Sequence, residues 1–199
     1  MKKAVLLIGT IVLAQTVLAA DLAPGEKAPD FTLTSIEGQA VSLTDFEGKI
    51  VVLEWTNHGC PFVKKHYSTD NMQKLQQTYT GKGVIWLTIC SSAPGKQGHM
   101  DTAAWKDAVE ENGTASTAVL PDPDGTVGRL YGASATPHMF VIGQQGKLAY
   151  QGAIDDNPSF NPKTVQGANN YVAEILDKML AGKTVEPYET KAYGCSVKY

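Results

Sequence analysis

A continuous apolar run over residues 50–53 and a second, largely apolar run over residues 84–89 constrain the fold more than any other feature of the sequence. An apolar run without alternation is typical of a strand that is buried on both faces of a sheet. Helical spacing follows the first run as far as Tyr79, and a second helix is expected over residues 102–111. Strands that alternate with helices in this way predict an α/β fold, with helices on both faces of the sheet.

Two predicted hairpins flank this central unit. The first joins residues 31–33 to residues 41–43, and the second joins residues 139–142 to residues 147–150. Short strands joined by glycine-containing turns are typical of antiparallel pairing. The second hairpin therefore makes the predicted sheet mixed. Residues 172–180 form the last amphipathic helix, and the sequence contains no internal repeat and no linker to a second domain.

The first twenty residues have the pattern of a secretory signal peptide. Lys2 and Lys3 precede an apolar run over residues 4–13, and small residues follow it. This run is too short to span a bilayer as an anchor, although an uncleaved anchor is the alternative. We expect a signal peptide over 1–20, a single domain over 21–199, and an exported, periplasmic protein without stable membrane insertion after cleavage.

The charge balance excludes several partners. The chain carries a formal net charge of -3, which becomes -5 once the two leader lysines are removed, and Arg129 is its only arginine. An acidic domain of this kind has no means of neutralising a row of phosphates, so we expect no nucleic-acid partner.

Three cysteines, Cys60, Cys90 and Cys195, lie outside the leader and would reach an oxidising compartment. The odd count allows at most one intramolecular disulfide. The remaining thiol is left to react, to bind metal or to be buried.

Cys60 stands where a buried strand meets a helix, and Pro61 occupies the first helical position. The unpaired N–H groups and the dipole at a helix start favour a thiolate, and Lys64 and Lys65 would add to this effect. Because the thiolate is the nucleophilic form, this position predicts a reactive cysteine. The alternative is an inert buried thiol.

Several segments together resemble the peroxiredoxin-like group of the thioredoxin-fold superfamily, also called the AhpC/TSA or redoxin group. They are residues 28–33, 51–55, 60–63, 136–137, 140–142 and 194–199. The resemblance implies a thioredoxin-like fold with a central mixed sheet, helices on both faces and an N-terminal hairpin. It also implies an oxidoreductase that acts on protein or small-molecule thiols and disulfides, with no cofactor.

The register of the motif decides between two chemistries. Glu54 precedes Cys60 by six residues, as a buried acid precedes the attacking cysteine of thioredoxins, and Val63 takes the place of the second cysteine. The peroxide-reducing cysteine of peroxiredoxins would also fall on Val63, and their arginine would fall near Pro137, eight residues after Arg129. The sequence therefore favours a thiol-disulfide oxidoreductase, with a thiol peroxidase as the alternative.

The resemblance also implies roles for residues around Cys60. Thr136 and Pro137 are similar to the cis-proline loop that faces the reactive cysteine. Glu54 is the one charge in an apolar strand, so it should be protonated, paired or functional, and it could pass protons to and from the thiols. Strand alternation also permits it to face solvent at a sheet edge.

The partner of Cys60 stays open between two cysteines. Cys195 lies in a polar tail that can reach across and resembles the family's tail, whereas Cys90 ends the neighbouring buried strand. We prefer Cys195 as the resolving thiol and keep Cys90 as the alternative. A purely structural disulfide between Cys60 and Cys195 would also fit the pattern.

Metal binding is the rival hypothesis. His58, Cys60 and His138 are candidate ligands of the soft kind that copper prefers, which would make the protein a copper-binding or chaperone-like module. The tight ligand spacing of a strong metal motif is missing, so we expect no metal. Residues 155–158 are interpreted as a turn.

Overall fold

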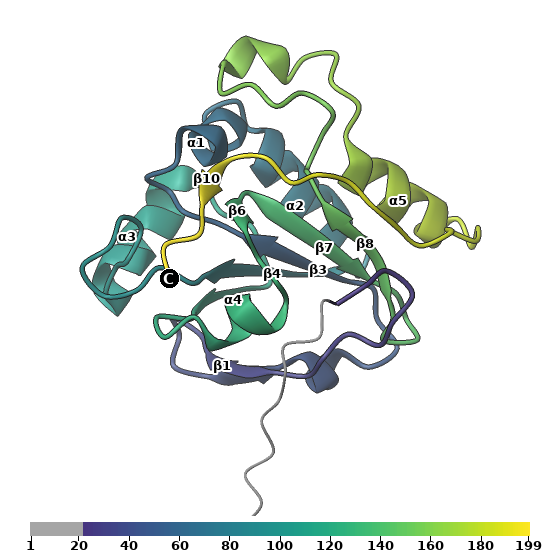
Figure 1. Cartoon of the computed structure of the whole chain (residues 1–199), viewed down its shortest axis with the longest axis horizontal. Helices are drawn as coiled ribbons and strands as arrows, with labels where there is room; N and C mark the ends of the chain where they lie inside the picture. Colours follow the sequence, from purple (N-terminus) through teal and green to yellow (C-terminus); the bar gives the residue numbers. More distant parts are fainter. Residues whose placement is uncertain (1–21) are drawn as a thin grey trace, which may run out of the picture.

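The computed structural model describes residues 22–199, and the predicted signal peptide over 1–20 lies outside this range. The predicted α/β architecture is confirmed: a mixed six-stranded sheet carries helices on both faces, and an N-terminal hairpin packs beside it (Figure 1). Within residues 22–199 no helix combines the length and apolarity needed to cross a membrane.

The sheet has the strand order β5-β4-β3-β7-β8-β9. Its strands are β3 (Val51–Trp55), β4 (Ile85–Cys90), β5 (Ala118–Pro121), β7 (His138–Ile142), β8 (Leu148–Gly152) and β9 (Tyr188–Glu189). The central strand β3 pairs in parallel with β4 and antiparallel with β7. All five residues of β3 are buried because packed elements cover both faces of the sheet, as the continuous apolar run predicts.

In the part of the chain that the structure describes, five α-helices and two short 3-10 helices surround the sheet. They are η1 (Leu43–Phe46), α1 (Pro61–Tyr67), α2 (Asn71–Thr80), α3 (Thr102–Asn112), α4 (Thr126–Leu130), η2 (Pro162–Thr164) and α5 (Tyr171–Leu180). The continuous helix expected up to Tyr79 is in fact two helices, because Asp70 takes a left-handed φ of 56° and begins α2. This break turns the chain between the helix that carries Cys60 and the helix that supports it.

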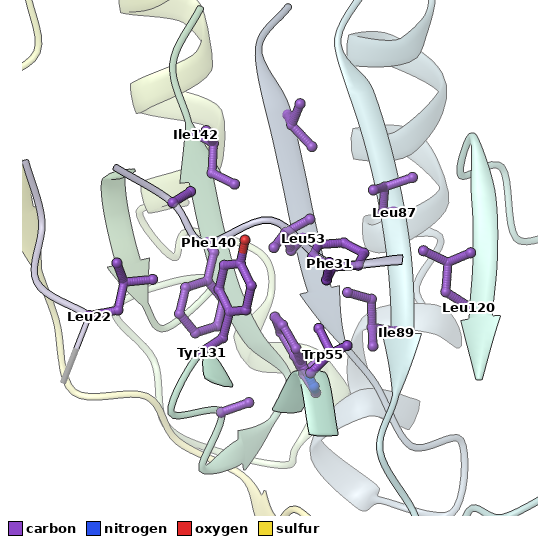
Figure 2. Packing of buried hydrophobic residues seen from close by; sticks show 14 of the residues in the cluster. Leu22, Phe31, Leu53, Trp55, Leu87, Ile89, Leu120, Tyr131, Phe140 and Ile142 are labelled. Carbon is purple, nitrogen blue, oxygen red and sulfur yellow. The ribbon is translucent and has the colours of Figure 1, made fainter. Parts of the chain in front are cut away.

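Alternation along β3 divides the core into two layers. Leu53 and Trp55 face α4 and the hairpin of β1 (Thr32–Thr34) and β2 (Ala40–Ser42), whereas Val52 faces α1, α2 and α5. Figure 2 shows the first layer, in which the Trp55 ring lies 5.0 Å from Phe140 and 5.5 Å from Tyr131. Large side chains buried in this way each stabilise the fold by about 1.5–3 kcal/mol.

The C-terminal tail is an ordered part of the fold. After β9 the chain crosses to α1, where β10 (Cys195–Ser196) pairs antiparallel with β6 (Ala135–Thr136) (Figure 1). The last residue, Tyr199, donates a hydrogen bond to the Ala133 carbonyl over 2.7 Å, and its ring lies 4.5 Å from the Arg129 guanidinium. The sequence predicts a polar tail that reaches across the fold, and the structure shows it pinned at several points along its length.

Candidate functional site: a thiol pair at the start of α1

Cys60 is the N-cap of α1, where its backbone changes from extended to helical. Its N–H donates to the Asn57 carbonyl over 2.8 Å, and its own carbonyl accepts the first helical bond from Lys64 over 2.9 Å. Pro61 follows at the first helical position, where no backbone N–H is needed. The side chain of Cys60 is completely buried, with 0% of its surface exposed. A reaction partner can therefore reach this thiol only if a covering segment moves.

The covering segment includes β10, which brings Cys195 to Cys60. The backbone N–H of Cys195 donates to Sγ of Cys60 over 3.4 Å. On the other side, the Cys60 thiol donates to the Thr136 carbonyl oxygen over 3.1 Å. All three cysteines are free thiols in the structure. Cys60, Thr136 and Cys195 therefore form one contiguous group, assembled from α1, β6 and β10.

The surroundings make the two thiols of this group unequal. Burial raises the pKa of Cys60, but hydrogen bonds from the side chains of Cys195 and Thr136 and from backbone N–H groups outweigh it. The pKa of Cys60 is therefore lowered from its ordinary value of 9.0. Burial and the neighbouring Cys60 instead raise the pKa of Cys195 to about 11. Cys60 is thus the more acidic thiol of the pair, and the thiolate is the form that attacks disulfides.

The Thr136–Pro137 peptide bond is cis, as the resemblance predicts. The loop approaches the tail so closely that only glycine fits at position 194. Gly194 has a φ of 138°, and a Cβ at this position would overlap the Thr136 carbonyl group. The hydroxyl of Thr136 also donates to the Cys195 carbonyl over 3.4 Å.

A buried polar network lies behind the thiol pair, and sequence reasoning missed it. Lys65 and His66 of α1 have 1% and 0% of their surface exposed, and both contact the hydroxyl of Tyr193, at 3.1 Å and 3.2 Å. Tyr193 donates in turn to Asp155, whose other oxygen lies 3.6 Å from the Lys65 ammonium. Residues 155–158, interpreted as a turn, thus also supply the buried counter-ion.

The expected role of Lys65 needs correction. Lys65, which the sequence predicts to favour the thiolate, directs its ammonium to Asp155 and to the Asn157 carbonyl, 3.0 Å away. A charged Lys beside a helix start looks like a thiolate partner in the sequence. Its pairing with Asp155 could be anticipated only from the position of Lys65 on the buried side of α1.

Glu54 is completely buried on β3, so the alternative that it faces solvent is wrong. Its carboxylate accepts hydrogen bonds from Tyr67 of α1 over 2.9 Å, from Gln76 over 2.9 Å and from Trp86 over 2.8 Å. Burial raises the pKa of Glu54 above 4.5, and these hydrogen bonds oppose the rise without cancelling it. The acid therefore lies beneath the helix that carries Cys60 and is tied to it through Tyr67.

Cys90 belongs to a separate cluster. It packs with Ile36, Trp105 and Val119, and its thiol donates to the Ser92 hydroxyl and the Gly98 carbonyl, both at 3.5 Å. Burial raises the pKa of this thiol. Cys195 therefore lies beside Cys60, whereas Cys90 contacts neither of these two cysteines.

The candidate metal ligands are not brought together. The His58 ring packs on Tyr67 and Trp105, with centroids 5.0 Å and 5.6 Å apart, and burial lowers its pKa to about 4. The His138 ring lies on Phe140, 4.5 Å away, on the opposite face of the sheet from the layer that contains Cys60. Across residues 22–199 no three His, Cys, Asp or Glu side chains are grouped as metal ligands.

The sequence profile of the AhpC/TSA family matches residues 24–151. The chain is 28% identical over 124 residues to the thiol-disulfide oxidoreductase ResA of Bacillus thuringiensis subsp. konkukian strain 97-27. That alignment covers 62% of this chain and 66% of the relative, so the chain spans just under two thirds of its length. The chain is also 28% identical over 145 residues to a protein of Mycobacterium tuberculosis strain CDC 1551 / Oshkosh whose name proposes a peroxiredoxin, covering 68% of this chain and 80% of that one.

Among solved structures, a conserved protein from Geobacillus kaustophilus superposes with a TM-score of 0.76 at 28% identity. The superposition covers 88% of this chain and 92% of that chain. The likeness therefore extends through nearly all of the described residues. A structure from Chlorobium tepidum whose title names a thiol:disulfide interchange protein DsbE also superposes, with a TM-score of 0.59 at 25% identity over 80% of this chain and 99% of that chain. Together the two likenesses confirm the predicted thioredoxin-like fold.

Proposed function

The chain belongs to the AhpC/TSA family, and on that basis we propose that it is a thiol-disulfide oxidoreductase with Cys60 as nucleophile and Cys195 as resolving thiol. The contact between the Cys195 N–H and the Cys60 sulfur carries the proposal, because a backbone atom of Cys195 lies 3.4 Å from that sulfur and this closeness supports exchange between the two residues. The similarity to ResA supports the same type of reaction.

The reaction proceeds in two exchanges. The Cys60 thiolate attacks one sulfur of a substrate disulfide, so that the substrate S–S bond breaks, one substrate thiolate leaves and a mixed disulfide forms. Cys195 loses its proton and attacks the Cys60 sulfur, and the second substrate thiolate leaves and is protonated. The substrate disulfide gains two electrons, and the two protein thiols lose them as the Cys60–Cys195 disulfide forms. An external dithiol restores the reduced pair.

The Thr136–Pro137 loop and Glu54 take supporting roles in this proposal. The loop holds Cys195 against Cys60 through the β10–β6 pairing. Glu54, with its raised pKa, is a positioning and proton-holding group that acts through Tyr67 on the helix of Cys60. If so, Glu54→Gln alters the pH profile of the exchange rate while Cys60 still reacts.

A thiol peroxidase is the second candidate, since one relative bears a name that proposes a peroxiredoxin. Arg129, the only arginine in the sequence, is engaged elsewhere: its guanidinium donates to the Asp124 carbonyl over 2.7 Å and stacks on Tyr199. Cys60 therefore lacks the arginine that would polarise a peroxide, which favours disulfide exchange over peroxide reduction.

The place of action is also part of the proposal. The pattern of residues 1–20 and the three cysteines support an exported protein with a mature domain over 21–199. Fusion of residues 1–25 to a reporter that is active only after export tests this directly.

The proposed function is tested by disulfide reduction with insulin as substrate. We expect Cys60→Ser to abolish the activity and Cys195→Ser to trap a mixed disulfide on Cys60, whereas Cys90→Ser keeps the wild-type rate. Loss of activity in Cys90→Ser with full activity in Cys195→Ser would reverse the assignment of the resolving thiol.

A further inference from the structure

The helix α1 carries two features at different positions along its length. Its N-cap is Cys60, and its second half carries Lys65 and His66, whose side chains are buried. Tyr193 contacts the second half of the helix, and two residues later Cys195 contacts the N-cap. The tail is therefore held against the same helix at two places.

The hydroxyl of Tyr193 is fully used as a hydrogen-bonding group. It accepts from the Lys65 ammonium over 3.1 Å and contacts His66 Nε2 at 3.2 Å, and it donates to Asp155. Burial and the charge of Lys65 lower the pKa of His66 to about 3, so the ring is neutral, and its Nδ1 lies 2.8 Å from the Asn71 amide. The neutral ring therefore donates from Nε2 to Tyr193 and accepts from Asn71 at Nδ1.

The ring of Tyr193 adds contacts of its own. It lies 5.8 Å from the ring of Phe62, the residue two positions after Cys60, and 5.1 Å from the Lys65 ammonium. Gly194 follows and passes the Thr136 carbonyl at a distance that no Cβ would allow. Three successive residues thus have three different contacts. Tyr193 holds the tail against α1, Gly194 passes the Thr136 carbonyl, and Cys195 contacts Cys60.

We propose that Tyr193 is a positioning residue whose hydroxyl holds the closing segment, residues 193–197, over Cys60 and thereby sets the rate at which Cys195 resolves a mixed disulfide. This inference rests on the proposed function. A substrate disulfide must displace the closing segment, since Cys60 is completely buried. The contacts of the Tyr193 hydroxyl, here called the latch, return Cys195 to the sulfur of Cys60 after the first exchange.

The inference predicts two effects of opposite sign. In Tyr193→Phe the ring stays and the hydroxyl is lost, so the closing segment opens more often. Alkylation of Cys60 by iodoacetamide should become faster, because the thiol is uncovered. Resolution of a Cys60–glutathione mixed disulfide by Cys195 should become slower, because the second thiol spends less time beside the first. We expect each rate to change by at least roughly tenfold, the effect of losing one hydrogen bond to a charged group, since the lost hydroxyl contacts both Lys65 and Asp155.

The matched control is Tyr79→Phe. The hydroxyl of Tyr79 also bonds a carboxylate, Asp177, over 3.1 Å, and the Ala173 carbonyl over 3.1 Å, but it joins α2 to α5 away from the tail. Loss of this hydroxyl should leave both rates at their wild-type values. Melting temperatures of the three proteins separate a general loss of stability from a local opening.

The experiment mixes each reduced protein with glutathione disulfide and follows the mixed disulfide by mass spectrometry, and a parallel sample is alkylated. In the first exchange one glutathione thiolate leaves, and in the second Cys195 displaces the other. Faster alkylation together with slower resolution in Tyr193→Phe supports the inference. Unchanged rates, or two rates that fall together, overturn it. If the wild type itself forms no mixed disulfide or never resolves one, the proposed function fails instead, and the alkylation rates alone still decide whether Tyr193 holds the segment closed.

Discussion

The backbone N–H of Cys195 lies 3.4 Å from the sulfur of Cys60, although the two residues are 135 positions apart in the chain. This contact joins the start of α1 to the end of the tail. It also accounts for the unequal acidity of the two thiols, because hydrogen bonds with Cys195 help to lower the pKa of Cys60.

The acidity of Cys60 should depend on the side chain of Cys195. In Cys195→Ala the hydrogen bond from that side chain is lost, and we expect the pKa of Cys60 to rise. Ultraviolet absorbance of the thiolate against pH measures this value, and Cys90→Ala is the control that should leave it unchanged. A pKa of Cys60 that is the same with and without the Cys195 side chain would show that this side chain does not lower it.

Gly194→Ala should open the site. The new Cβ would overlap the Thr136 carbonyl and would also carry the strain of a positive φ. Gly167→Ala is the matched control, since Gly167 has a φ of 88° but its new Cβ would meet no atom within 4 Å. We expect a cost of about 1–3 kcal/mol from backbone strain in both variants. Only Gly194→Ala should slow formation of the Cys60–Cys195 disulfide, as measured by loss of free thiols, and equal rates in the two variants would count against the close approach.

Lys65→Met should destabilise the protein strongly. It would leave Asp155 buried without its cation, and breaking a buried ion pair costs about 3–5 kcal/mol. The control is Lys178→Met, which removes the exposed pair with Glu174 and should cost less than about 1 kcal/mol. Urea unfolding measures both. The double variant Lys65→Met with Asp155→Leu should recover part of the loss, and a double variant no more stable than Lys65→Met would argue against a paired charge.

Acid should weaken the fold through its buried histidines. Burial lowers the pKa of His138 from 6.5 to about 4, so between these values the unfolded chain binds a proton that the folded chain does not. The stability contributed by the neutral ring is therefore present above pH 6.5 and is lost as pH falls toward 4, at about 1.4 kcal/mol per pH unit. His138→Gln should reduce the slope of unfolding free energy against pH by one proton in this window. An unchanged slope would mean that His138 titrates normally in the folded protein.

The sheet and the place of Cys60 could be predicted from local pattern. The apolar run of β3, the Cys-Pro pair at the start of α1 and the Thr-Pro pair before β7 are short-range signals, and the structure places them as expected. The break at Asp70 was missed because helical spacing continues through it, and only the left-handed backbone of that residue divides the helix.

The rest of the site depends on long-range contacts that periodicity does not encode. Tyr193 meets Lys65 across 128 positions, and neither residue looks unusual in its own segment. Lysine is mostly exposed in proteins, so the sequence assigned Lys65 to the thiolate rather than to a buried ion pair. Resemblance to the family pointed to Cys195, whereas the contacts of the neighbouring Tyr193 with α1 could be found only in the folded structure.

The measurement that tests the central claim most directly is peptide mapping of residues 21–199 under non-reducing conditions, before and after a mild dithiol. We predict that oxidation by one equivalent of glutathione disulfide yields a Cys60–Cys195 bridge, that the dithiol opens it, and that Cys90 stays a free thiol throughout. A bridge from Cys60 to Cys90, or a Cys60 that remains unpaired while Cys195 is free, would contradict it.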